Sequence, residues 1–160
     1  MAVLIQDSFT GTPNAKISSR PSDVGGYWAG PSNGTVDAGG TRANFCNDQH
    51  TTKASSFNCY AQAQYIADPV PEWLGVMELH INNGHNYLKV QSYNNQVYLN
   101  ATLLGALWAS GSVYKIERSG DTVNAYKDGA LIGSVAAAVP HAGDFDFTLV
   151  CTFLKYLSNI

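Results

Sequence analysis

Hydrophobic and polar residues alternate in short runs along most of this chain, and almost no run has the spacing of a helix. The runs are rich in β-branched and aromatic residues, and Gly, Asn, Asp and Ser separate them. A period of two residues is typical of strands with one buried and one exposed face. The pattern predicts an all-β protein with strands at residues 3–9, 41–46, 56–66, 73–81, 86–93, 96–102, 113–118, 122–127, 131–135 and 145–156.

Three turns determine which of these strands are neighbours. They lie at residues 94–95, 119–121 and 128–129, where Asn, Asp, Ser and Gly stand between two β-like runs. These residue types tolerate the positive φ angles of tight hairpin turns. Residues 10–40 contain Pro13, Pro21 and Pro31, which disfavour long regular elements there. Strands joined in this way, with no helices between them, predict an antiparallel β-sandwich or jelly roll of two packed sheets.

The chain length of 160 residues agrees with one domain over residues 1–160. A domain of this size buries about two-thirds of its surface on folding, so its core needs no disulfide or metal. No internal repeat or linker divides the sequence.

Charge narrows the classes of partner. Charged residues make up 13% of the chain, against about 25% in a typical soluble domain, and the formal net charge is −3. The absence of any Lys/Arg run argues against nucleic acid and anionic membranes as partners. No apolar stretch approaches the roughly 18 residues of a membrane span, and the first residues lack the pattern of a signal peptide. Low charge also gives little repulsion between copies, so a homo-oligomer is one expected assembly.

The three cysteines, Cys46, Cys59 and Cys151, are an odd number in a chain without an export signal. This favours reduced thiols that serve as small buried hydrophobic residues. A zinc site would have to recruit Cys46, His50 and Cys59, whose spacing does not match the common structural sites. The sequence therefore predicts no metal and no cofactor.

Residues 113–135 carry a specific pattern. An aromatic strand runs into Arg118, Ser119 and Gly120, a second strand leads to Asp128-Gly129, and a short strand ends in Gly-Ser. This stretch resembles the late hairpins of the concanavalin A-like lectin/glucanase superfamily, especially its laminin-G-like jelly rolls. The resemblance implies two packed antiparallel sheets, one of them concave. Members of the superfamily include lectins, glycanases, calcium-dependent adhesion modules and virion proteins. The resemblance therefore leaves open both the function and whether calcium is bound.

The opening of the chain adds a second resemblance. Residues 7–12 and 22–28 are similar to the first segment of small jelly-roll proteins of bacteriophage and bacterial genomes. This implies a non-catalytic virion-surface protein, made in the host cytoplasm, that decorates a capsid or tail and binds the major capsid protein or another virion protein. Tyr27 and Trp28 are the candidate interface residues, since aromatic residues are enriched at interface centres. A stand-alone lectin and a polysaccharide-degrading enzyme remain the alternatives.

Carboxylate spacing bears on hydrolysis. Retaining glycanases of the superfamily carry Glu-x-Asp-x-x-Glu on one strand, and this chain lacks it. Glu72 and Glu78 would stand about 20 Å apart along a strand, too far for either hydrolytic mechanism. Asp144 and Asp146 share a face about 7 Å apart, which suits inversion in principle, but the pattern favours charges at the exposed start of the last strand.

A lyase would need a base, a tyrosine acid and a cation that neutralises a uronate. His85, Tyr87 and Lys89 supply these types close together, although a chain with nine tyrosines also produces such groupings by chance. The sequence accordingly predicts no catalytic residues.

Alternation predicts instead a polar, aromatic sheet face. In residues 86–93, Leu88 and Val90 fall on one face, and the turn at 94–95 brings residues 96–101 alongside. Flat rings suit the C–H faces of sugars, and planar amides pair with sugar hydroxyls, so the face fits a neutral glycan. An ordinary solvent-facing sheet has a similar composition, and both interpretations stay open. The candidate glycan-binding residues are Tyr87, Lys89, Gln91, Tyr93, Gln96, Tyr98 and Asn100.

Overall fold

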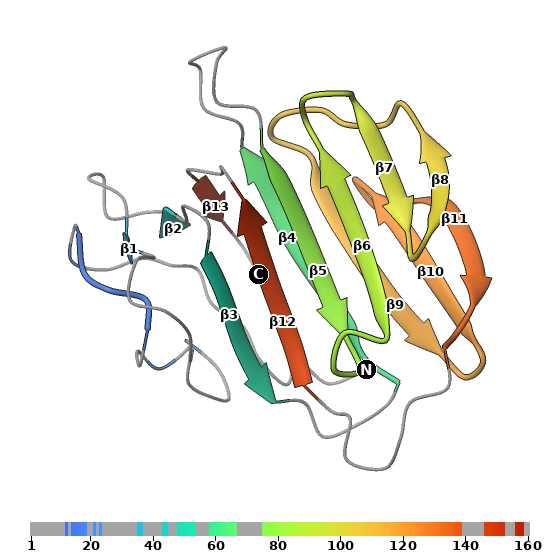
Figure 1. Ribbon diagram of the computed structural model, residues 1–160, viewed down its shortest axis with the longest axis horizontal. Coiled ribbons are helices and arrows are strands. Elements are labelled where there is room, and N and C mark those ends of the chain that lie inside the picture. Colours follow the sequence, from blue (N-terminus) through green and yellow to red (C-terminus); the bar gives the residue numbers. More distant parts are fainter. Residues whose placement is uncertain are drawn as a thin grey trace.

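Two antiparallel sheets make up the molecule in the computed structural model (Figure 1). The structure describes residues 12, 14–18, 21, 23, 35–36, 43–44, 48–53, 58–66, 75–138, 146–152 and 156–158, and these contain no helix. One sheet has seven strands, in the order β1 (Thr35–Val36), β2 (Ala43–Asn44), β13 (Tyr156–Ser158), β4 (Tyr60–Ile66), β9 (Val113–Ser119), β10 (Thr122–Lys127) and β11 (Ala130–Ala136). The other has six, in the order β3 (Asp48–Lys53), β12 (Asp146–Thr152), β5 (Val76–Ile81), β6 (Asn86–Gln91), β7 (Gln96–Leu99) and β8 (Thr102–Gly105).

The prediction of an all-β sandwich is confirmed, and the three predicted turns are confirmed with it. Asn95, Gly120, Asp128 and Gly129 all have positive φ angles, of 55°, 59°, 50° and 82°. Because these residue types accept that conformation at low cost, the turns were the most predictable local features. No described helix is long and apolar enough to cross a membrane.

Several predicted strand boundaries were wrong. The expected strand at 96–102 divides into β7 and β8, because Asn100 adopts a φ of 50° and turns the chain back. The strand expected at 86–93 ends at Gln91, and the one at 145–156 is β12 followed by β13. Of the strand expected at 41–46, the structure describes residues 43–44, which form β2. The strand expected at 3–9 lies outside the described residues.

β3 was not predicted at all. Its sequence, Asp-Gln-His-Thr-Thr-Lys, has no hydrophobic position from which alternation could be recognised. It is a strand because it pairs with β12 over residues 48–53, and that pairing joins segments almost a hundred residues apart. Tertiary pairing outweighs a weak local preference here.

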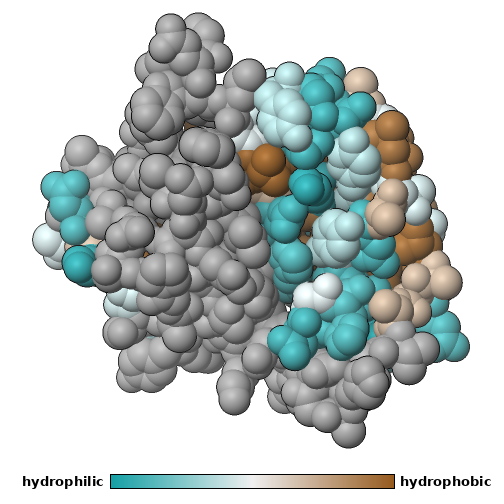
Figure 2. Space-filling model, in the orientation of Figure 1, coloured by the Kyte–Doolittle hydropathy of each residue, from teal (hydrophilic) through white to brown (hydrophobic). Residues whose placement is uncertain are grey.

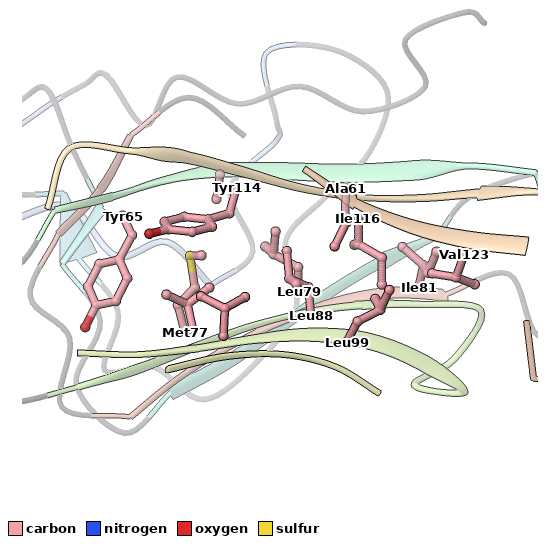
Figure 3. Packing of buried hydrophobic residues seen from close by; sticks show 14 of the residues in the cluster. Ala61, Tyr65, Met77, Leu79, Ile81, Leu88, Leu99, Tyr114, Ile116 and Val123 are labelled. Atoms are coloured by element: carbon pink, nitrogen blue, oxygen red, sulfur yellow. The ribbon is translucent and has the colours of Figure 1, made fainter. Parts of the chain in front are cut away.

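The core lies between the two sheets, and their inward side chains point at one another (Figure 3). Met77, Leu79 and Leu88 from the six-stranded sheet are fully buried against Tyr114 and Ile116 from the other. β4 contributes small residues to the same layer, so large side chains interdigitate with alanines. The six-stranded sheet therefore has one apolar face, and its opposite face is left for polar residues.

The edges of the two sheets approach closely where β8 and β11 lie. A Cβ built on Gly133 would stand 2.5 Å from Cδ2 of Leu104, so a larger residue at 133 would force the Leu104 side chain to move. Gly133 belongs to the hairpin sequence that carries the superfamily resemblance, and this contact gives that glycine a packing role.

Cys59 is confirmed as a buried free thiol. Burial raises its pKa to about 11, and the positive charge of Arg118 offsets part of that rise. Such a thiol is unreactive at neutral pH. Cys46 lies outside the described residues, and of Cys151 only the backbone, in β12, is described.

Candidate functional site: an aromatic hollow over β6 and β7

A hollow of about 380 Å³ lies on the outward face of the six-stranded sheet, over β6 and β7. In the view of Figures 1 and 2 this sheet faces the reader, and its described surface is mainly hydrophilic, with hydrophobic residues toward the β8 edge. The residues that line the hollow are Tyr87, Lys89, Gln91, Tyr93, Asn94, Tyr98, Asn100 and Ala101.

The alternation of side chains along β6 and β7 explains which residues form the centre of this hollow. Leu88 and Val90 are fully buried in the core, which turns Tyr87, Lys89 and Gln91 outward. Lys89 lies directly opposite Tyr98 on β7, and Gln91 lies opposite Gln96. Six of the seven candidate glycan-binding residues thus line the hollow. Gln96 stands behind the lining, where its Oε1 accepts hydrogen bonds from Asn94 and from the Tyr98 hydroxyl.

Turns, not strands, supply the two ends of the hollow. Tyr93 was expected within a strand, but it lies in the turn of residues 92–95 and is 50% exposed. Asn100 lies in the β7–β8 turn, where its Oδ1 accepts from the backbone N–H of Tyr87 at 2.9 Å. The backbone N–H of Asn100 donates to the backbone carbonyl of Tyr87 at 2.8 Å. These bonds fasten the β7–β8 turn to the start of β6.

Asn94 and Ala101 were missed by the sequence prediction. Both occupy turns, and alternation assigns no face to turn residues. The available signal was their position next to Tyr93 and Asn100, each one residue along the chain.

A network of amides holds the rings in place. Gln91 is only 7% exposed; its Nε2 donates to the Tyr93 hydroxyl at 2.6 Å, and its Oε1 accepts from Asn94 at 3.0 Å. Side chains that are already ordered lose less entropy when a ligand binds. The hollow therefore presents preorganised rings and amides.

Charged groups meet at one side of the hollow. The Nζ atom of Lys89 lies 3.2 Å from Oε1 of Glu78, and Nε2 of His80 lies 2.8 Å from Oε2 of the same carboxylate. The hydrogen bond from His80 lowers the pKa of Glu78; burial acts in the opposite direction, and Lys89 lowers it further. The His80 ring also stacks on Tyr87, with centroids 5.5 Å apart. Glu78 and His80 were not among the predicted site residues, although alternation in β5 turns both outward.

The structure describes only some of the residues that the catalytic alternatives would use. Glu72 and Asp144 lie outside them, and for Asp146 only the backbone in β12 is described. Of the three residues that a lyase would use, Tyr87 and Lys89 line the hollow and His85 does not.

His80 is the imidazole beside Tyr87, and two neighbours surround its ring nitrogens. Its Nε2 atom is engaged by Glu78, and its Nδ1 atom faces the tight turn at Gly84, where an added Cβ would be 3.6 Å away. These contacts orient the ring, and His80 is not among the residues that line the hollow.

Other predicted features fall outside the hollow or outside the described residues. Tyr27 and Trp28 are not described. Within the part of the chain that is described, no group of three or more His, Cys, Asp or Glu side chains could hold a metal ion.

Comparison with known proteins identifies the fold. No protein-family model and no curated protein matches the sequence. Among solved structures, the carbohydrate binding module CBM66 from Bacillus subtilis is similar with a TM-score of 0.54 and 14% identity, over 94% of this chain and 95% of that one. Sheep galectin-11 has a TM-score of 0.49 and 8% identity over 69% and 95%, and the Bacillus licheniformis β-glucanase has 0.48 and 8% over 98% and 81%. The likeness to the binding module shows that the chain has the concanavalin A-like jelly-roll fold.

Proposed function

We propose that this protein binds carbohydrate without catalysis and that the glycan lies in the hollow over β6 and β7. The observation that carries the proposal is the convergence of three tyrosine rings and three amide side chains on one outward sheet face. Tyrosine rings pack against the C–H faces of sugars, and amides offer a donor and an acceptor to neighbouring hydroxyls.

Size and order support the same function. A volume of about 380 Å³ falls within the range of small-molecule sites. Before a ligand arrives, the Tyr93 hydroxyl is already bonded to Gln91 and the Tyr98 hydroxyl to Gln96, which suits a binding site. The fold is also that of a protein described as a carbohydrate binding module. The absence of catalysis is supported by the sequence, which lacks the Glu-x-Asp-x-x-Glu arrangement of the superfamily's retaining glycanases.

A glycan array probed with the labelled protein tests this function. We expect binding to a defined group of glycans, and weaker binding by Tyr93→Ala, whose ring is the most exposed of the three. Incubation of the bound glycans with the protein should release no new reducing ends. An array without a binder would contradict the binding function, and turnover that is lost in Glu78→Gln would contradict the absence of catalysis.

A virion role is a second candidate, and the resemblance of residues 7–12 and 22–28 to phage jelly-roll proteins favours it. In this proposal the protein decorates a capsid or tail through Tyr27 and Trp28 and leaves the hollow free for host-surface glycans. The protein should then co-sediment with purified particles at a fixed ratio to the major coat protein, and free glycan should not release it. Absence from such particles would leave the stand-alone lectin.

A further inference from the structure

Among the described residues that line the hollow, Lys89 is the one with a formal charge. Its side chain is 33% exposed, and its ammonium group contacts Glu78 on the neighbouring strand β5 at 3.2 Å. Glu78 is 20% exposed and does not line the hollow. The charge that faces a ligand is thus paired with an opposite charge behind it.

Glu78 is held as a carboxylate from two sides. Oε2 interacts with His80 and Oε1 with Lys89, and these contacts lower the pKa of the carboxyl group despite its partial burial. The residues that flank this pair across the sheet carry no charge, since Val150 is the backbone partner of Glu78 and Tyr98 is that of Lys89. With a neutral imidazole, the pair has a net charge of zero.

This pairing determines how the hollow responds to ligand charge. An unpaired ammonium group on a partly buried face would attract the carboxylate of a uronate or sialate, or a sulfate ester. With Glu78 beside Lys89, an anionic group that approaches the ammonium also approaches a carboxylate, and the two interactions largely cancel. The ammonium can still donate hydrogen bonds to hydroxyl groups.

We propose that the hollow selects uncharged sugars and that Glu78 is the specificity-determining residue, because it cancels the charge of Lys89 and leaves no net attraction to offset the cost of desolvating an acidic group. This inference rests on the proposed function, since it assigns the class of glycan to the same site.

The experiment uses a glycan array with matched pairs, in which each uncharged oligosaccharide has a sialylated, sulfated or uronate counterpart. Wild type should bind the uncharged members of the pairs. Glu78→Gln should bind the acidic members about tenfold more tightly than wild type does at low ionic strength, because one nearby negative charge has been removed. Its affinity for the uncharged members should stay within about threefold. Added salt should reduce the gain, because salt screens the freed ammonium group.

Glu117→Gln is the matched control. Glu117 also pairs with a lysine, Lys115, at 3.1 Å, but on the outer face of the other sheet. The control should leave the selectivity unchanged. Lys89→Gln is the reciprocal variant, and it should weaken acidic relative to uncharged binding further because Glu78 is then uncompensated. It also provides the test if Glu78→Gln does not fold.

The outcomes separate the inference from the proposed function. Three results would overturn the role of Glu78 while the binding function stands. Wild type could bind the acidic and uncharged members equally, or the ratio of the two affinities could stay unchanged in Glu78→Gln and Lys89→Gln. The third such result is a gain in acidic binding by Glu117→Gln equal to that of Glu78→Gln. An array on which wild type and both hollow variants bind nothing would overturn both.

Discussion

The outer faces of the two sheets have similar residues but different arrangements. On the six-stranded sheet, Lys89 lies opposite Tyr98 on one side and Glu78 on the other. On the seven-stranded sheet, Lys115 lies opposite Tyr126 on one side and Gln62 on the other. The two lysines therefore differ in one cross-strand neighbour, which is a carboxylate in the first case and an amide in the second.

Both lysines pair with a carboxylate, Lys89 with Glu78 on the neighbouring strand and Lys115 with Glu117 on its own strand, but their ammonium groups differ in their contact with rings. Lys89 contacts Glu78, on the side away from Tyr98. Lys115 lies over the Tyr126 ring, 4.1 Å from its centroid, and 5.6 Å from that of Tyr60. A cation over a ring occupies the face that a sugar would use. A polar, aromatic sheet face is thus a candidate binding site only where its own side chains leave the rings accessible.

The largest expected effect tests whether the two sheets share one core beneath these different faces. Leu88→Ala, under the hollow, and Ile116→Ala, in the opposite sheet, should each lower the free energy of unfolding by about 2–5 kcal/mol, because both side chains are fully buried. Urea denaturation measures both values. A cost below about 1 kcal/mol for either variant would mean that the two sheets do not depend equally on this core.

The next effect concerns the rings themselves. Tyr98→Ala should weaken glycan binding by about 1–2 kcal/mol, through the loss of one stacking contact, whereas Tyr126→Ala should leave it unchanged. Isothermal titration with a glycan identified on the array gives both affinities. Equal losses in the two variants would show that the distinction between the faces is wrong.

A smaller effect follows from the pKa of Glu78. Because folding lowers this pKa from its ordinary value of 4.5, the carboxylate contributes stability that is present above that pH and is lost as the pH falls through the folded pKa. The free energy of unfolding of wild type should exceed that of Glu78→Gln by about 0.5–1 kcal/mol between pH 6 and 8. The difference should shrink below about pH 4.5 and vanish in stronger acid. Denaturation curves across this range measure it, and a difference that does not change with pH would contradict the ion pairs.

The smallest effect is expected on the seven-stranded sheet. Lys115→Met removes the ammonium group from the Tyr126 and Tyr60 rings and from Glu117, and it should cost about 0.5–1 kcal/mol of stability. Lys127→Met, one strand away on β10, is the control and should change stability by less than about 0.5 kcal/mol. Equal costs for both variants would argue against the ring contacts.

Local pattern predicted most of the hairpin region between residues 75 and 138. Leu88, Val90, Val97 and Leu99 are buried as alternation requires, and the turn at Asn95 has the expected positive φ angle. Prediction was weaker where strand formation depends on distant pairing, as in β3, and at Asn100, whose turn divides an apparently continuous strand. In both cases the decisive interaction lies outside the local sequence window.

By itself, the sequence determined which side chains of β6 and β7 face outward, because side-chain direction follows from strand periodicity and burial of the apolar face. It also determined which turns could close the hairpins, since few residue types accept positive φ angles. Only the tertiary structure decided which outward face contains a hollow, because that depends on turn residues such as Asn94 and Ala101, to which alternation assigns no direction. It also decided that Lys89 pairs with Glu78 while Lys115 covers a ring, since cross-strand neighbours are set by the register between segments that the sequence pattern does not align.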